Sequence, residues 1–173
     1  TAASTADHYN VAVGYHAGAA ITTGINNTII GGLAGDALTT GTRNVAIGLN
    51  ALGTEDTGSH NVAIGHQALA VADAGADAYN VAIGSSAGLA VTTGIKNTIT
   101  GGLAGDAITD GNENTAYGYS SLSGEDSGDL NTAFGAQALG TQDGGDGNVA
   151  LGRQAGLNIS TGDNNTVVGT NAG

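Results

Sequence analysis

The residues that could carry catalytic or metal chemistry are few in this chain, and their spacing does not suit either. There is no cysteine, and the four histidines follow no metal-ligand spacing: His8, His16, His60 and His66. The serines have no histidine and aspartate at matching positions of the repeats described below. We therefore predict that the chain is not an enzyme.

Carboxylates recur at matching positions. Two aspartate pairs are spaced 17 residues apart, each with a preceding glutamate: Glu55–Asp56 with Asp73, and Glu125–Asp126 with Asp143. Carboxylates one strand spacing apart, about 4.8 Å, repel each other, and Ca²⁺ would relieve that repulsion. The glycine-rich nonapeptide pattern of calcium-binding β-rolls is missing. We favour solvated acidic turns and no cofactor, and keep calcium as the alternative at Asp56, Asp73, Asp126 and Asp143.

Threonine pairs raise a second alternative, an ice-binding solenoid, which needs a flat and unbroken threonine ladder. The pairs are Thr22–Thr23, Thr39–Thr40 and Thr92–Thr93. The ladder is interrupted at the equivalent positions Asp56–Thr57, Asp73–Ala74 and Asp143–Gly144. The β-propensity of threonine explains the pairs equally well.

The composition excludes several classes of partner. Three basic against fifteen acidic residues give a net charge of −12, whereas nucleic acids and anionic membrane surfaces both require clustered Lys and Arg. No apolar run is long enough to insert into a membrane. Thirty-two glycines beside one Phe, five Tyr and no Trp predict a thin core made of small aliphatic side chains.

A short motif, Asn-x-apolar-x-Gly, organises the whole chain. Successive copies are 17 residues apart, except for one step of 19 after the fourth copy. The ten copies begin at Asn10, Asn27, Asn44, Asn61, Asn80, Asn97, Asn114, Asn131, Asn148 and Asn165. A fixed period of this kind indicates a repeat architecture.

A longer period is superimposed on the short one. The segment from Asn10 returns almost unchanged from Asn80 and begins again at Asn148. We expect one solenoid domain over residues 1–173, cut from a longer array. Its blocks of four repeats span 10–79 and 80–147, with a partial block at 148–173.

A unit of 17 residues rich in glycine and β-branched residues suits one coil of a parallel β-solenoid rather than a helical hairpin. We expect a strand of about five residues, a turn, a short second strand and another turn. Ten coils would make a rod roughly 48 Å long. The ten asparagines would stack as a structural ladder, bonding to one another and to turn backbone.

The repeated strand is apolar on both faces, as in "VAIG" at Val62. We expect Val62 and Ile64 to fill the interior and Ala63 to face another copy of the chain. One aliphatic residue per coil alternates between two positions, which indicates a constant core volume. It is Leu in some coils, such as Leu52. In others Gly takes that place and an aliphatic follows three residues later, as in Gly35 and Leu38.

The "NVAIG" and "NTAFG" repeats resemble the head repeats of YadA-like trimeric autotransporter adhesins and related repeats of phage tail fibres. The resemblance runs from Asn10 to Gly173. It implies a left-handed β-roll that assembles as a homotrimer, located outside the cell on a bacterial surface or a phage particle. It also implies partners such as a host-surface molecule, a matrix protein or a glycan.

We therefore expect a structural and adhesive fibre segment, with ice binding as the alternative function. Recognition would fall to side chains that vary between coils, since the invariant ones are occupied by folding. The two residues after each motif glycine vary in this way, and aromatic and polar side chains among them suit contact surfaces. The candidate contacts are Tyr15, His16, His66, Gln67, Tyr119, Arg153 and Gln154.

Overall fold

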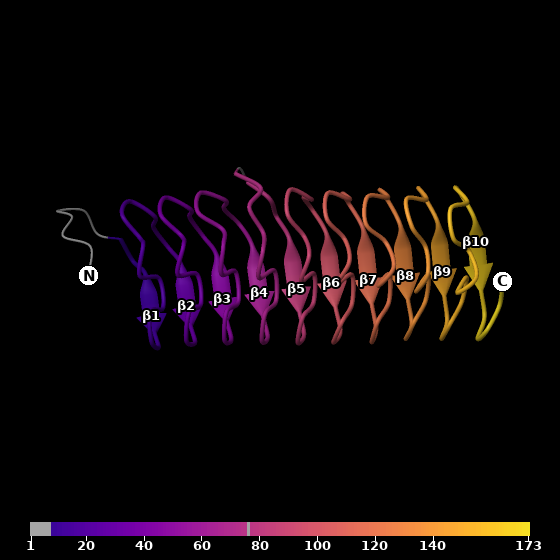
Figure 1. Cartoon of the computed structure of the whole chain (residues 1–173), viewed down its shortest axis with the longest axis horizontal. Coiled ribbons are helices and arrows are strands. Elements are labelled where there is room, and N and C mark those ends of the chain that lie inside the picture. Colours follow the sequence, from indigo (N-terminus) through magenta and orange to yellow (C-terminus); the bar gives the residue numbers. More distant parts are fainter. Residues whose placement is uncertain (1–7, 76) are drawn as a thin grey trace.

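The chain winds into a rod of stacked coils, one for each sequence repeat (Figure 1). The computed structural model describes residues 8–75 and 77–173. Each coil contributes one three-residue strand, and we number the coils 1 to 10 accordingly. The strands are β1 (Val11–Val13), β2 (Thr28–Ile30), β3 (Val45–Ile47), β4 (Val62–Ile64), β5 (Val81–Ile83), β6 (Thr98–Thr100), β7 (Thr115–Tyr117), β8 (Thr132–Phe134), β9 (Val149–Leu151) and β10 (Thr166–Val168).

The ten strands form one parallel sheet in sequence order. Neighbouring strands pair in the register of the repeat, so Ala46 of β3 pairs with Ala63 of β4. Ala63 in turn pairs with Ala82 of β5, although the repeat between them is two residues longer. The described residues contain no helix. The predicted all-β parallel solenoid is confirmed.

The strands are shorter than predicted, and the described part of each coil holds no second strand. Left-handed backbone is the reason. In coil 4, Gln67 and Leu69 have φ values of 57° and 48°, closely after the strand ends at Ile64. Such residues turn the chain and cannot continue an extended segment. The turns instead bond to the next coil, as when the Leu52 N–H donates to the Ala68 carbonyl (3.0 Å).

The motif glycine is required by the close stacking of the coils. A Cβ atom on Gly65 would lie 2.3 Å from the carbonyl oxygen of Gly84 in the next coil, and Gly65 also has a φ of 138°. Only glycine meets both conditions without strain. This accounts for the glycine that follows the strand in every repeat.

The two faces of the sheet are reversed relative to our expectation. Ala63 is fully buried inside the coil, whereas Val62 and Ile64 lie on the outer face and are partly exposed. The prediction that Ile64 points inward and Ala63 meets another copy is wrong. The interior is narrow: beside Ala63, coil 4 contributes chiefly Ala68 and one large aliphatic, Leu69, to the buried core.

The predicted exchange of aliphatic positions explains how this narrow interior stays filled. Leu52 and Leu69 are fully buried in their coils, and Val91 is fully buried in coil 5, where Gly88 takes the place of leucine. A Cβ on Gly88 would lie 3.0 Å from Leu69 and 3.3 Å from Val91. The space that a side chain at position 88 would need is therefore already filled by Leu69 and Val91, and glycine avoids a clash with them.

The ten motif asparagines form one column along the rod at the start of the strands, and those of coils 2 to 9 are buried. In coil 3, Asn44 Oδ1 accepts the backbone N–H of Asn61 (2.9 Å) and Asn44 Nδ2 donates to the Gly58 carbonyl (2.9 Å). Each side chain thus joins its own coil to the next. Asn61 differs, because Nδ2 is buried without a partner in the described structure, in the coil that carries the two extra residues.

Truncating Asn44 should therefore destabilise the rod more than truncating Asn61. Asn44→Ala leaves the Asn61 N–H and the Gly58 carbonyl buried without partners, at a cost of about 2–5 kcal/mol. Asn61→Ala leaves only the Asn80 N–H, at about 1–3 kcal/mol, and removes an amide that is already unpaired. The free energy of unfolding in urea measures both, and equal losses would contradict this account of the ladder.

Candidate functional site

The outer face of the sheet is a surface that runs along all ten coils of the rod. Each strand presents its first and third residues outward, and all twenty of these side chains are uncharged. The third residues form the more exposed column, with Val13, Tyr117 and Val168 between 50% and 65% exposed. We call these twenty residues the sheet face. It extends across all ten strands, roughly 43 Å at a strand spacing of about 4.8 Å.

Two aromatic rings interrupt the aliphatic column of the sheet face. Tyr117 and Phe134 stack with their ring centroids 4.7 Å apart and their planes within 4° of parallel. The residues beside them, Thr115 and Thr132, are small. The sheet face is therefore uncharged from end to end and mostly apolar, with threonines at both of its positions in coil 6, and it is raised at coils 7 and 8. A long exposed surface that is mostly apolar is typical of an interaction site.

The predicted contact residues flank the sheet face where the strands end. Tyr15, His66, Tyr119 and Arg153 directly follow the motif glycines and are exposed. We call the residues at this position the glycine-side row. The residues next to them in the chain, His16, Gln67 and Gln154, have φ values of 55–57°. Gln154 Nε2 donates to Gln137 Oε1 (2.9 Å), and the Tyr15 and His16 rings lie 4.3 Å apart.

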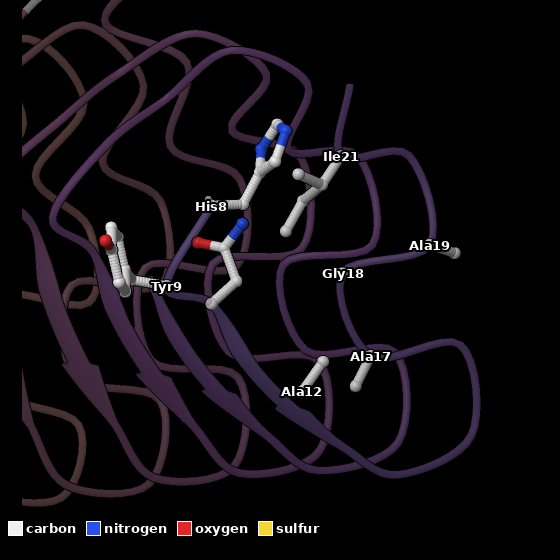
Figure 2. A pocket seen from close by; sticks show the side chains of 8 residues that line it. His8, Tyr9, Ala12, Ala17, Gly18, Ala19 and Ile21 are labelled. Carbon is white, nitrogen blue, oxygen red and sulfur yellow. The ribbon is translucent and has the colours of Figure 1, made fainter. Parts of the chain in front are cut away.

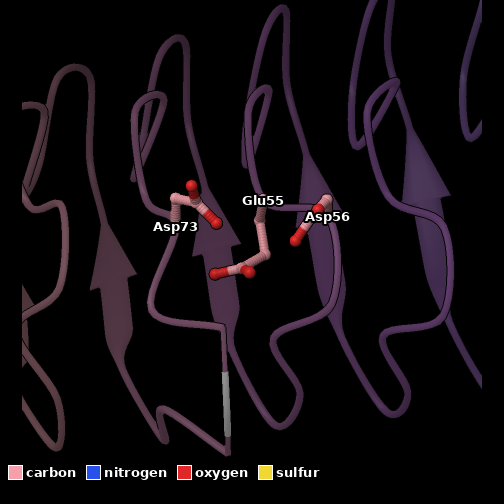
Figure 3. Close-up of side chains that lie close together, drawn as sticks. All are labelled: Glu55, Asp56 and Asp73. Carbon is pink, nitrogen blue, oxygen red and sulfur yellow. The ribbon is translucent and has the colours of Figure 1, made fainter.

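The acidic residues singled out in the sequence do come together. Oxygens of Glu55, Asp56 and Asp73 all lie within 4.8 Å of one another (Figure 3). The two aspartates are exposed, as are their counterparts Asp126 and Asp143 in coils 7 and 8. Hydrogen bonding and repulsion from Asp126 raise the pKa of the Asp143 carboxyl. These oxygens could be ligands for a divalent cation, although exposed carboxylates also lie together where no ion binds.

Glu55 differs from the solvated acid that we expected, because its side chain is fully buried. The carboxylate accepts the backbone N–H groups of Gly58 (2.7 Å) and of Ala74 in the next coil (3.4 Å). Loss of solvation raises the pKa of Glu55, and the nearby Asp73 and Asp56 charges raise it further, against the two backbone bonds. Glu55 occupies the position of the exchanged aliphatic, and that equivalence was the sequence signal for its burial.

In the second block the equivalent glutamate accepts two more hydrogen bonds, one of them from the backbone N–H of Ser127 (3.2 Å). Glu125, the counterpart of Glu55, is also fully buried and accepts the N–H groups of Gly128 (2.6 Å) and Gly144 (2.8 Å). In addition, buried Gln142 donates from Nε2 to Glu125 Oε2 (2.8 Å). The first block has Ala72 where the second has Gln142, so Glu55 has no such donor.

We expect Glu55 to make the stability of the rod fall as pH rises. Its pKa in the folded chain lies above the ordinary value of 4.5, so folding favours the protonated form. That contribution is complete below pH 4.5 and is lost as pH rises through the folded pKa. Melting temperatures between pH 4 and pH 7 measure the slope, which Glu55→Gln should reduce.

Ala72→Gln is the matched variant, since it copies the arrangement of Gln142 and gives Glu55 a donor. It should flatten the slope while keeping the carboxyl. Burial also raises the pKa of Asp106, so this residue contributes to the pH dependence of the parent chain as well. The contribution of Glu55 is therefore measured as the difference in slope between the parent chain and each variant. An unchanged slope in both variants would show that Glu55 is not its source.

The threonines of the ice-binding alternative bond mainly to backbone. Thr22 Oγ1 donates to the Thr39 carbonyl (3.2 Å), and Thr39 Oγ1 donates to the Asp56 carbonyl (3.0 Å). Thr92 and Thr109 repeat this arrangement in the second block. The column continues through Asp56 and Asp73, so the row of hydroxyls is broken between the blocks.

The histidines are not brought together. His8 Nδ1 lies 3.2 Å from the Gly24 carbonyl, and the His60 ring stacks on Tyr79 with centroids 4.7 Å apart. Among the described residues, Glu55, Asp56 and Asp73 form the one group of three or more metal-ligating side chains.

A hollow of about 560 Å³ opens at the first coil, lined by His8, Asn10, Ala12 and Ile21 among others (Figure 2). It is the cross-section of the coil interior, which in the other coils is covered by the preceding one. Ala12, Ala17 and Ile21 point into it just as their equivalents point into the closed core. The hollow is thus a feature of the core rather than a ligand pocket.

No protein-family model, curated protein or solved structure shows significant similarity to the chain. The described residues include no helix that could cross a membrane.

Proposed function

We propose that the chain is a structural and adhesive segment of an extracellular fibre, carried on a bacterial surface or a phage particle. One observation supports this most directly. The chain has a net charge of −12, yet the sheet face has no charged side chain along its whole length. Acidic rods repel each other, so an uncharged apolar face is the surface on which copies can meet.

The occupant of the sheet face in this proposal is a second and a third copy of the chain. Three rods that pack their sheet faces around a common axis bury the Val, Ile, Tyr and Phe columns and leave the acidic turns in solvent. The repeats that resemble trimeric adhesins favour three copies over two. The glycine-side row remains at the outer edge of such an assembly, where it can contact a host-surface molecule, a matrix protein or a glycan.

The repetition of the rod suggests how adhesion would work. No described residue cluster forms an enclosed ligand pocket, so each coil offers at most a weak contact. Many weak contacts on a rigid rod bind together because each attachment raises the effective concentration of the next. This proposal makes no use of catalysis, and we propose no cofactor.

Two adjacent substitutions test the association. Ile64→Asp places a charge on the sheet face and should turn the assembly into monomers that melt close to the temperature of the parent coil. Ala63→Arg instead forces a charged side chain into the buried interior and should unfold the coil, at a cost of several kcal/mol. Light scattering gives the mass and circular dichroism the melting temperature. A monomeric parent chain, or an Ile64→Asp variant of unchanged mass, would refute the association.

Shortening the rod tests adhesion. Deletion of residues 80–147 removes coils 5 to 8 and joins Tyr79 to Asn148, whose coil has the same sequence pattern as the coil from Asn80. The six remaining coils should stay folded, while attachment to a host or matrix surface should weaken far more than in proportion to length. Equal attachment by the short rod would refute avidity. Thermal hysteresis in the parent chain would favour the ice-binding alternative instead.

A further inference from the structure

A second row flanks the sheet face on the side where the strands begin, and its middle part is basic and aromatic. It consists of the residues directly before the ladder asparagines, which we call the asparagine-side row. Before Asn44, Asn61, Asn80 and Asn97 these residues are Arg43, His60, Tyr79 and Lys96. Arg43, Tyr79 and Lys96 are exposed, and His60 is partly exposed. The chain has three Lys and Arg residues in total, and two of them stand here.

The backbone holds this row rigidly. All four residues have a left-handed φ, between 55° and 65°, which directs the side chain out of the coil. The backbone N–H groups of Arg43, His60 and Lys96 each donate to a carbonyl of the preceding coil, at 3.1, 3.0 and 2.7 Å. The four side chains are therefore presented one strand spacing apart, about 4.8 Å, without the freedom of a loop.

The side chains within the row are partly organised already. The His60 and Tyr79 rings stack face to face along the rod, with centroids 4.7 Å apart and an interplanar angle of 13°, so each ring fixes the orientation of the other. Asp77 Oδ1 lies 3.4 Å from His60 Nδ1, and Lys96 Nζ donates to Glu113 Oε1 (2.9 Å). The Arg43 guanidinium has no side-chain partner among the described residues. Its five donors and two of the three on Lys96 remain for a ligand.

Acidic residues accumulate toward one end of this edge of the rod. The residues directly before Arg43, His60 and Lys96 are uncharged Thr42, Ser59 and Ile95. The corresponding positions farther along the chain hold Asp129 and then Asp146, whose carboxylates accept backbone N–H groups of the preceding repeat (2.7 and 2.8 Å). Two acids do lie against the row, Asp77 beside His60 and Glu113 bonded to Lys96, whereas Arg43 has no acidic partner among the described residues.

We infer that the asparagine-side row from Arg43 to Lys96 binds an extended polysaccharide that bears carboxylate groups, lying along the rod with about one sugar ring per coil. Arg43 and Lys96 would bind carboxylates, and the stacked Tyr79 and His60 side chains would contact the sugar ring between them. A guanidinium suits a carboxylate because its planar donors bind both oxygens. This assignment rests on the proposed adhesive function and gives it a ligand class and a site.

The spacing favours a sugar chain over an acidic peptide. An extended peptide advances about 3.3–3.4 Å per residue and falls out of step with coils about 4.8 Å apart. An extended chain of six-membered sugar rings advances by a ring length, which is close to the coil spacing. A nucleic acid carries a phosphate at every nucleotide, and two basic side chains on a chain of net charge −12 are too few to hold it.

The test measures retention of the whole chain on immobilised polygalacturonate, with dextran as the uncharged polysaccharide and a poly-glutamate peptide as the acidic peptide. We expect binding to polygalacturonate that weakens with salt, and little to the other two. Arg43→Ala with Lys96→Ala should lower the affinity at least about tenfold, since each removes a charge-assisted bond. Tyr79→Ala should lower it less. Thr57→Ala, on an exposed turn outside both rows, should change it less than twofold.

The outcomes separate this inference from the proposed function. Equal binding to dextran or poly-glutamate, no binding to polygalacturonate, or an equal loss in the Thr57→Ala variant would each overturn the assignment of the row. Surface attachment and mass of the double variant are measured in parallel. If the rod attaches to surfaces and assembles but does not bind polygalacturonate, only the proposed polysaccharide site is refuted. If it binds polygalacturonate but attaches to no surface, the site is supported and the adhesive function is refuted.

Discussion

Each coil of this protein is one strand spacing thick, and the rest of the structure depends on that constraint. Any atom that rises above its own coil meets the backbone of the next, as a Cβ on Gly65 would meet the Gly84 carbonyl at 2.3 Å. The residue at each position of the repeat must therefore pack against the equivalent residues in the coils before and after it. Glycine meets this demand at the corner, asparagine meets it by bonding to the coil above, and the strand alanine meets it by being small. The monotony of the sequence is a consequence of this geometry.

The positions that stack through backbone or through a buried side chain are constrained, and the others are free. Ala63 and Asn61 cannot vary without disturbing two neighbours, whereas the side chains before and after the strand leave the coil at once. The surface of the rod can therefore carry any chemistry while the fold stays the same. This is why the two rows beside the sheet face differ from coil to coil, although the backbone beneath them repeats so closely.

The periodicity made the fold predictable, because a 17-residue repeat with a glycine corner and apolar strand permits few architectures. The assignment of the inner and outer faces of the strand was wrong, because we placed the larger side chains of Val62 and Ile64 inside the coil. The interior is in fact too narrow for them. A sign of this was present in the sequence: the inner alanine becomes isoleucine at Ile29 and Ile99, in coils whose leucine is replaced by Gly35 and Gly105.

Burial of Glu55 was missed because acids are expected in solvent, and the neighbours that retain it are backbone amides that no side-chain pattern reveals. Positive φ at Arg43 and His60, which aligns the asparagine-side row, also leaves no mark in residue type.

The hydrogen bonds between coils run along the axis of the rod, and this has a mechanical consequence. A pull on the two ends would load these bonds along their own direction and mainly at the terminal coils, so coils would detach singly rather than all at once. Each released coil of 17 residues extends to roughly 56–61 Å, against about 4.8 Å in the stack. The same ladder resists compression, since the coils are already in contact. A fibre built this way is stiff when pushed and lengthens in steps when pulled, and it would dissipate a sudden load before the weak contacts along its sides have to carry it.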